Sequence, residues 1–569
     1  MLRVQTDRHS WMLFPLILVL LFMVACGASA PPSPDAQPGE ATAVGPTATP
    51  IPEVVQTPTG PVTSARTSIT MVAGEEPASL GALDPGCAGS PEVAPCADYA
   101  SDPFTYISGK DLEVVPLSGV DRWEQIAPER WRFFLRPEVK FHNGEPWNAQ
   151  AAKLGIDWIG DPANAHVGYQ YTGNVSAEVV DNLTVDVVCD EACPIYPRTA
   201  FHTRFQAPQW FQSAADDERN RQTIGFGPYQ LTEWQRGEFI RMEAYEDYLP
   251  NPAVPEAQAP IIREATIVHR EEPTVRAAMV KTGEADFAFD IGFQNINQVP
   301  VAKIGSTSEI FVMYVDTIWH PELKKKEVRQ ALVHAINCQE IVEALYDGQT
   351  ECRGNVAPPG TLGITSENGK PYEYNPELAR QLLQEANYDP NNEIIIYVRA
   401  GRYYRNTEVA EATLNYWKEV GVNASVQVVE TAQWREISRS GPGQYADNPL
   451  DAPNQPPPPP THASAHVYQN FPSDESLDFQ KMAVGTMSCY ATSSKVCQPD
   501  RIESLIQPAV SATGEERKRR LEELASIVHD DVLFIPYFDA KIVYGIHQDL
   551  KFEPRYDRRV RLNTLSFAR

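Results

Sequence analysis

The residues that could perform chemistry are scattered along the chain and do not form a catalytic set. The eleven histidines are dispersed, and the sequence contains no G-x-S-x-G, H-E-x-x-H or C-x-x-C motif. His462 and His466 lie four residues apart, but a proline-flanked segment is a poor frame for a metal site. The side chains of the adjacent residues Glu271 and Glu272 diverge on regular structure, so they do not make an acid–base pair. The sequence therefore predicts no enzymatic activity, and no metal or cofactor.

The charge balance excludes one class of partner. The chain has 48 Lys and Arg residues against 75 Asp and Glu residues, which gives a net charge of −27 at pH 7. Such a surface repels nucleic acid and anionic membrane surfaces. We therefore expect no nucleic-acid partner. The acidic surface either serves solvation or favours a cationic or neutral ligand.

The nine cysteines indicate an exported, oxidised chain. Cys26 stands alone near the N-terminus, and the other eight form four pairs that are local in sequence, which is typical of disulfides in secreted proteins. Each would close a short loop and contribute at most about 3 kcal/mol. Zinc binding by Cys189 and Cys193 is the alternative, but no His or Cys nearby completes a zinc site. The expected disulfides join Cys87 to Cys96, Cys189 to Cys193, Cys338 to Cys352, and Cys489 to Cys497.

The first 66 residues predict a secretion signal and a lipid anchor. Basic residues precede an apolar run over residues 11–24, which suits a signal peptide over residues 1–25 and is short for a membrane span of ~20 residues. Residues 23–26, MVAC, resemble a bacterial lipobox, in which Cys26 becomes the lipidated first residue. An ordinary signal peptide that contains a cysteine is the alternative. Residues 26–66 are rich in Pro, Ala and Thr, so we expect an unfolded tether.

The elements that could hold a ligand lie in the long body that follows. Residues 67–569 are too many for one core and predict two or three domains. Residues 394–398 are an apolar strand, and after the loop over residues 399–406 come a helix over 408–420 and a strand over 424–429. This is a βαβ unit, whose loop lies at the carboxyl end of a parallel strand, where open α/β sheets bind ligands. By contrast, residues 441–461, rich in Pro and Gly, predict an exposed loop.

Residues 131–146, WRFFLRPEVKFHNGEP, predict two short strands and a turn. Pro137 ends the first strand, Asn143 and Gly144 form the turn, and Asn148 can cap a helix over residues 149–160. This order resembles the signature of the family 5 extracytoplasmic solute-binding proteins, the peptide- and nickel-type receptors of ABC importers. Two further stretches resemble the family: a Gly-x-Gly-Pro-Tyr strand start in residues 224–249, and VRQAL at residues 328–332.

The resemblance implies an α/β fold, two-lobed and periplasmic-binding-protein-like, of the large type II class. It implies a subdomain inserted in the first lobe. The expected bounds are residues 67–110, 223–306 and 533–569 for lobe I, 111–222 for the inserted subdomain, and 307–532 for lobe II.

The implied function is that of a lipid-anchored receptor on the extracytoplasmic face of the cell membrane. It would capture a peptide or another small polar solute by hinge closure and pass it to the permease of an ABC importer. The ATPase of the importer would be an indirect partner, reached through the permease. We expect a monomer. A solute-sensing module for a signalling partner would share these features. A lipid-anchored hydrolase would need the catalytic set that the sequence lacks.

The resemblance also implies ligand-binding residues. Peptide-binding members place an Arg and a Tyr in the loop after the apolar strand and a Trp after the next strand. These match Arg402, Tyr403 or Tyr404, and Trp434. An arginine can bind a carboxylate through two hydrogen bonds, and aromatic rings bury much area. The alternative is that Tyr403 and Tyr404 pack against the start of the helix.

Two further candidates come from other loops. Asp84 lies in a loop that resembles the one passing beside the ligand in this family, and Trp319 lies in the loop before the helix that contains VRQAL. Peptide receptors also carry an Asp-x-x-Asp-Pro-like stretch whose aspartate binds the ammonium of the ligand. Residues 445–472 contain no such stretch, and Asp447 and Asp451 are the candidates there.

Overall fold

The computed structural model describes most of the body of the chain. Residues 63–569 form one compact unit. No described helix is both long and apolar enough to cross a membrane. The expected signal peptide, Cys26, Cys96 and Arg402 lie outside the described residues, as does the expected tether except Arg66. The described residues are 66–84, 87, 98–166, 168–399, 403–445, 448–456 and 466–568.

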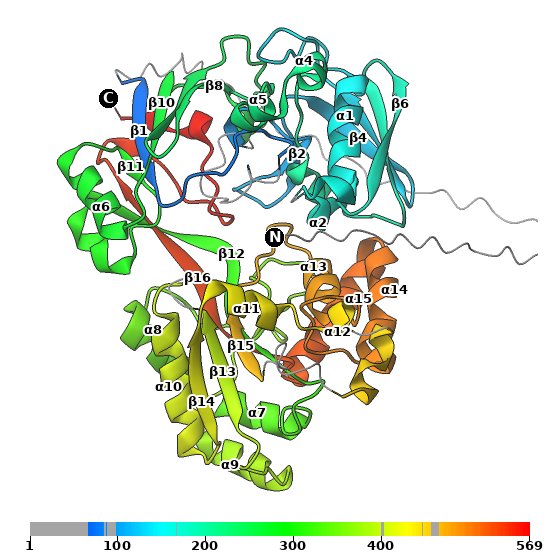
Figure 1. Cartoon of the computed structure of the whole chain (residues 1–569), viewed down its shortest axis with the longest axis vertical. Coiled ribbons are helices and arrows are strands. Elements are labelled where there is room, and N and C mark those ends of the chain that lie inside the picture. Colours follow the sequence, from blue (N-terminus) through cyan, green and yellow to red (C-terminus); the bar gives the residue numbers. More distant parts are fainter. Residues whose placement is uncertain are drawn as a thin grey trace, which may run out of the picture. The chain divides into compact units, whose positions relative to one another are not determined.

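One mixed sheet of ten strands forms the frame of this unit. Strands β12 (Val301–Val315) and β16 (Phe534–Ile546) pair along their length and run from one half of the sheet into the other (Figure 1). We call the half beside β16 the first lobe and the half beside β12 the second lobe. The first lobe contains β1 (Ser68–Ala73), β8 (Tyr229–Gln235), β9 (Phe239–Ala244), β10 (Glu264–His269) and β11 (Phe287–Ala288), and the second contains β13 (Ile394–Arg399), β14 (Ala424–Val429) and β15 (Val467–Asn470).

The pairing of β12 with β16 is interrupted where the lobes meet. Ser306 pairs with Lys541, but the next pair joins Ile310 to Asp539, so residues 307–309 bulge opposite Ala540. A bulge bends the strand that carries it and loosens the ladder locally. The strands therefore have a weak point between the two lobes. The lobe bounds expected from the sequence stay a prediction.

The second lobe has a core on each face of its part of the sheet. Side chains of β12 alternate between the two faces, as the pleat of a strand requires: Phe311 and Met313 belong to one core, and Val312 and Tyr314 belong to the other. Helices cover both faces (Figure 1). The first core includes α7 (Lys326–His334), α8 (Cys338–Tyr346), α9 (Pro376–Glu385) and α10 (Asn406–Glu419), and the second includes α14 (Ser504–Ser511) and α15 (Gly514–Asp530).

A second, four-stranded sheet lies within residues 120–222, which we call the small-sheet subdomain. Its antiparallel order is β4-β5-β7-β6. Helix α1 (Ala149–Gly160) contacts β6 and β7, and the Asn148 side chain caps it by accepting from the backbone N–H groups of Gln150 and Ala151 at 3.1 and 3.0 Å. The predicted helix and cap are confirmed. The strands are β4 (Val120–Ala127), β5 (Arg130–Leu135), β6 (Val175–Asp181) and β7 (Thr184–Cys189).

Two glycines let the chain pass from this subdomain back to the first lobe. A Cβ atom on Gly225 would lie 2.0 Å from the carbonyl oxygen of Ala100, and one on Gly227 would lie 2.3 Å from that of Tyr99. Any side chain would clash with backbone that cannot yield. The Gly-x-Gly-Pro-Tyr stretch thus serves close backbone contact.

The predicted βαβ unit is present, because β13 pairs in parallel with β14 after helix α10. The sequence predicts an exposed loop over residues 441–461; the described part of this stretch has several exposed residues but is helical, and it packs against the body at Gly441. This part contains α12 (Pro442–Tyr445) and a 3₁₀ helix over Pro449–Asn454. Gly441 is buried, and its N–H donates to the carbonyl oxygen of Thr492 at 2.7 Å. Packing against the segment around residue 492 orders this stretch despite its composition.

The structure contains three of the disulfides expected from the sequence. They join Cys189 to Cys193, Cys338 to Cys352, and Cys489 to Cys497. Cys87 is also disulfide-bonded. Each of the three described bonds closes a loop within one subdomain or lobe, so none crosses between the lobes.

Candidate functional site

Two cavities lie where the lobes face each other. The larger, which we call cavity A, has a volume of about 460 Å³. Tyr171 and Thr199, from helices α2 (Tyr169–Thr172) and α3 (Tyr196–Thr199) of the small-sheet subdomain, line one side. Residues of the second lobe, among them Phe471 and Lys481, line the other. The volume lies within the range of about 300–1,000 Å³ that is usual for small-molecule sites.

The smaller cavity, cavity B, measures about 120 Å³. Phe293 of the first lobe and Tyr403 and Tyr404 of the second lobe are among its lining residues. Phe471 lines both cavities. The two cavities therefore share one aromatic wall.

The topology of the second lobe explains this wall. Strands β13 and β15 are parallel, so their carboxyl ends reach the same edge of the sheet. Tyr403 follows β13 and Phe471 follows β15 directly. Their rings stack with centroids 3.6 Å apart at an interplanar angle of 24°. The edge of the sheet that faces the first lobe thus carries a stacked aromatic pair.

Cavity A also contains a half-buried cation. The Nζ atom of Lys481 donates to the hydroxyl of Tyr171 at 3.2 Å and to that of Ser473 at 3.4 Å. Burial lowers the pKa of Lys481, but Tyr171 and the carboxylates of Asp474 and Glu475 raise it more, so the net shift is upward. The lysine is therefore charged at neutral pH and bridges the small-sheet subdomain to the second lobe.

Asp474 lies beside this lysine and is fully buried. One carboxylate oxygen accepts from the Ser476 hydroxyl at 2.6 Å, and the other has no hydrogen-bond partner among the described residues. Burial raises the pKa of Asp474 to about 7, although the charge of Lys481 acts in the opposite direction. The carboxyl group is thus partly protonated at neutral pH.

An ion-pair network links the lobes next to cavity A. Arg559 donates to Glu475 of the second lobe at 2.9 Å and to Asp98 of the first lobe at 2.9 and 3.0 Å. All three side chains are at most 6% exposed. Arg198 of the small-sheet subdomain adds a hydrogen bond to the carbonyl oxygen of Ser476 at 3.2 Å. The segment after β15 is therefore the part of the second lobe that touches both other parts.

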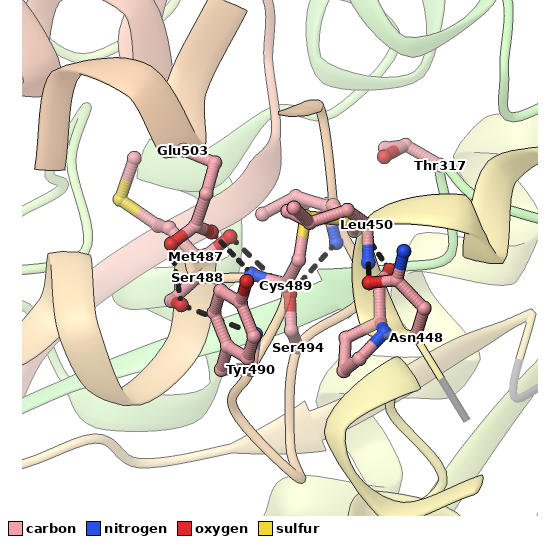
Figure 2. Close-up of a disulfide and its surroundings, with 12 residues drawn as sticks. Thr317, Asn448, Leu450, Met487, Ser488, Cys489, Tyr490, Ser494 and Glu503 are labelled. Atoms are coloured by element: carbon pink, nitrogen blue, oxygen red, sulfur yellow. Dashed lines mark hydrogen bonds between the residues drawn. A yellow bond between two sulfur atoms is a disulfide. The ribbon is translucent and has the colours of Figure 1, made fainter. Parts of the chain in front are cut away.

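A disulfide holds another part of the cavity wall (Figure 2). It joins Cys489 to Cys497, and the loop between them includes Ser493, which lines cavity A. The Glu503 carboxylate accepts from the backbone N–H of Cys489 at 2.6 Å and from the Ser488 hydroxyl at 3.0 Å. The disulfide thus closes the loop, and the Glu503 carboxylate fixes its first residues by hydrogen bonds.

The residues that the sequence analysis proposes for ligand binding lie in different places. Tyr403 and Tyr404 line cavity B. Trp434 lies on α11 (Thr431–Ser438), where its indole N–H donates to the carbonyl oxygen of Gln469 at 3.2 Å. It does not belong to the described lining of either cavity.

The other proposed residues lie away from the two cavities. Trp319 packs near the disulfide of Cys489 and Cys497. Asp84 lines a separate cavity of about 290 Å³ with Trp158 and Arg219. Asp451 is exposed and accepts from the Asn448 side chain at 2.9 Å, whereas Asp447 lies outside the described residues.

Sequence reasoning did not identify the polar residues of cavity A. Residues 445–472 contain no aspartate stretch of the family type, and the acidic residues Asp474 and Glu475 follow directly after them. Lys481 stands in the run FQKMAVGTM, where it is the one charged residue. A charge within an otherwise uncharged run was the available signal. No group of His, Cys, Asp and Glu among the described residues could hold a metal ion.

The comparison with family models agrees with this architecture. The model for bacterial extracellular solute-binding proteins, family 5 Middle, matches residues 113–470, more than half of the chain. The chain belongs to this family. The fold class expected from the sequence, α/β and two-lobed, is confirmed. Family 5 is a family of solute-binding proteins that act outside the cytoplasm.

Curated relatives match part of this family 5 chain. The glutathione-binding protein GsiB of Escherichia coli K12 is 28% identical over 321 residues, and GsiB of Shigella flexneri serotype 5b is 27% identical over 317 residues. Each match covers 54% of this chain and 60% of the relative. The chain thus matches less than two thirds of the length of these relatives.

Solved structures share the fold over nearly the whole of their length. CtaP, an ABC transporter substrate-binding protein of Listeria monocytogenes, has a TM-score of 0.74 and 16% identity, and the match covers 89% of this family 5 chain and all of CtaP. A dipeptide-binding protein of Pseudoalteromonas sp. SM9913, in complex with Met-Leu, has a TM-score of 0.67 and 18% identity, with 88% and 100% covered. At this identity the likeness shows the fold alone.

Proposed function

We propose that the chain is the solute-binding component of an ABC importer and holds a small peptide or another small polar solute between its lobes. The observation that carries this proposal is cavity A, whose walls come from the small-sheet subdomain and from the second lobe. A site divided in this way is complete only when the lobes meet. Binding would therefore favour the closed arrangement by the differential contacts that it makes there.

The bulge of β12 supports a hinge between the lobes. Residues 307–309 break the ladder with β16, and Thr307 and Glu309 also line cavity B. A few residues at such an interruption can absorb the dihedral changes of a domain closure. We propose that the lobes rotate about this bulge when solute enters.

The proposed partners follow from the family and from the N-terminal sequence. An importer permease would recognise the closed lobes, and the ATPase of the importer would supply the energy. Lipidation of Cys26 and the tether over residues 26–66 would hold a monomer at the extracytoplasmic face of the membrane. More than one acyl chain would be required, since a single chain anchors only marginally.

The relatives suggest which solutes to test first. GsiB is named for glutathione, and the structure from Pseudoalteromonas contains the dipeptide Met-Leu. Both are short peptides, and the aromatic pair Tyr403 and Phe471 offers the flat apolar surface that a peptide side chain would contact.

Isothermal titration of the purified protein with dipeptides, tripeptides, glutathione, simple sugars and a nickel–histidine complex tests the proposal. We expect one class to bind. In a denaturant titration, a binder held at 100 times its Kd should raise the free energy of unfolding by about 2.7 kcal/mol. Turnover of a solute during the titration would contradict the proposed function. Binding of a sugar alone would agree with the receptor function but would exclude a peptide as its solute.

A further inference from the structure

Three side chains of cavity A each keep one proton to donate that has no acceptor among the described residues. The ammonium of Lys481 has three N–H bonds, and it directs two of them to the hydroxyl oxygens of Tyr171 and Ser473, at 3.2 and 3.4 Å. Each hydroxyl accepts from the lysine and keeps its own proton to donate. Neither hydroxyl donates to another group of the described residues. All three residues line the cavity.

The same ammonium has no ion partner. No carboxylate of the described residues lies within 4.0 Å of its Nζ atom, so Lys481 forms no salt bridge. The charge of Glu475 acts on Lys481 from a distance, but its carboxylate pairs with Arg559 at 2.9 Å. Asp474 is a weak counter-ion, because burial raises its pKa to about 7. The ammonium is half-buried and keeps its third N–H bond, so an anion that enters the cavity can accept a charge-assisted hydrogen bond from it.

Positively charged side chains lie beside these donors, although the chain as a whole is acidic. The His202 ring stacks on Tyr171 with centroids 3.5 Å apart. Burial lowers the pKa of His202, and the positive charges of Arg559, Arg204 and Lys481 lower it further. The imidazole is therefore neutral and adds no charge of its own. The net charge of −27 thus does not describe the electrostatics of this cavity.

We propose that Lys481, Tyr171 and Ser473 bind a carboxylate group of the solute in cavity A. The inference rests on the proposed solute-binding function and narrows its solute to one that carries an anion. One ammonium and two hydroxyl donors match a singly charged oxyanion. A phosphate dianion would require a second cation among the donors. The solute carboxylate would also join the two sides of the cavity, since Tyr171 belongs to the small-sheet subdomain and Lys481 to the second lobe.

Matched peptide pairs test the inference on the purified full-length protein. Each pair consists of a di- or tripeptide with a free C-terminal carboxylate and the same peptide as its C-terminal amide, titrated into wild type and Lys481→Met. In wild type the acid should bind about 10- to 100-fold more tightly than the amide, the usual range for a charge-assisted hydrogen bond. Lys481→Met should abolish the preference and leave amide binding within about 3-fold.

Two other variants separate the site from general effects. Tyr171→Phe removes one donor and should weaken acid binding about 3- to 10-fold without affecting the amide. Lys418→Met removes the same charge from the exposed side of α10 and should change neither. The far-ultraviolet circular dichroism and melting temperature of each variant verify folding.

A second arm uses small anions, so that the two proposals can fail separately. Line broadening of ¹³C-acetate in the presence of the protein, with inorganic phosphate as competitor, measures anion binding directly. If peptides bind with equal affinity as acid and as amide, the carboxylate site is refuted but the receptor function stands. Acetate binding that Lys481→Met abolishes, with no peptide bound, would support the site and contradict the peptide. Stronger competition by phosphate than by unlabelled acetate, or no anion binding at all, would overturn the carboxylate assignment.

Discussion

The contact between Glu475 and Arg559 makes a quantitative prediction about closure. Both side chains are 6% exposed, and they lie in different lobes. If the lobes separate, water can solvate both charges, so the contact contributes only in the closed state. Glu475→Gln therefore changes the closing equilibrium and leaves each lobe intact. The amide oxygen that this substitution introduces would still accept one hydrogen bond, and Asp98 would still neutralise Arg559 at 2.9 Å.

The size of the effect follows from these remaining contacts. Truncation of one partner in a buried, hydrogen-bonded charge pair costs about 2–5 kcal/mol, and much of this is the charge left unpaired. Because Arg559 keeps Asp98, we expect the lower end, about 2 kcal/mol. If the free protein is open, the whole cost appears in binding and weakens the Kd about 30-fold.

Isothermal titration gives the Kd, and small-angle X-ray scattering reports whether the liganded variant is more extended than liganded wild type. Glu516→Gln is the control, because its carboxylate is 48% exposed and pairs with Arg519 on the surface of α15, where such pairs contribute about 0–1 kcal/mol. A change of less than about 3-fold in Kd for Glu475→Gln, with an unaltered scattering profile, would refute the reasoning.

Three further predictions concern stability. Arg561→Met should cost about 3–5 kcal/mol of unfolding free energy in denaturant titrations, because Arg561 and Asp102 are both fully buried and Asp102 would keep an uncompensated charge; a loss below about 1 kcal/mol would contradict this. Replacement of Cys489 and Cys497 by Ser should cost about 2–3 kcal/mol and weaken solute binding, and reductant should lower the melting temperature of wild type but affect the double variant less. The pKa of Asp474 rises from 3.8 unfolded to about 7 folded, so the folded state binds more protons in between. Wild type should therefore lose stability from about pH 4 to about pH 7 relative to Asp474→Asn, and parallel pH profiles from urea titrations would exclude this role.

Elements with a local signal were predictable from the sequence. The Asn148 cap and the apolar spacing of residues 149–160 specify α1 with its observed bounds. Strand β14 begins at Ala424 and ends at Val429, as the alternation of valine with Ser425 and Gln427 indicates. In both cases neighbouring residues alone determine the structure.

Elements that depend on distant partners were not predictable. The first half of β12 contains Lys303 and the polar residues 306–308, without a strand pattern, and is held by its pairing with β16. Strand β15 has four residues, which is too short for a periodic signal. Tyr403 and Tyr404 could be placed at a sheet edge from the βαβ unit. Phe471 and Lys481 could not, because their position depends on the parallel register of β15 with β13.

The polar character of the contact between the lobes has a consequence for how a receptor of this kind would work. An apolar interface of the same extent would remain closed without solute, because burial of apolar surface is favourable by itself. A buried ion pair roughly breaks even against its desolvation, so the contact between Glu475, Arg559 and Asp98 fixes the closed geometry while adding little net energy. The solute then decides the equilibrium between the open and the closed arrangement of the lobes. An anion that accepts from Lys481 and Tyr171 would add a contact that exists only when the lobes meet, and its departure would remove that contact.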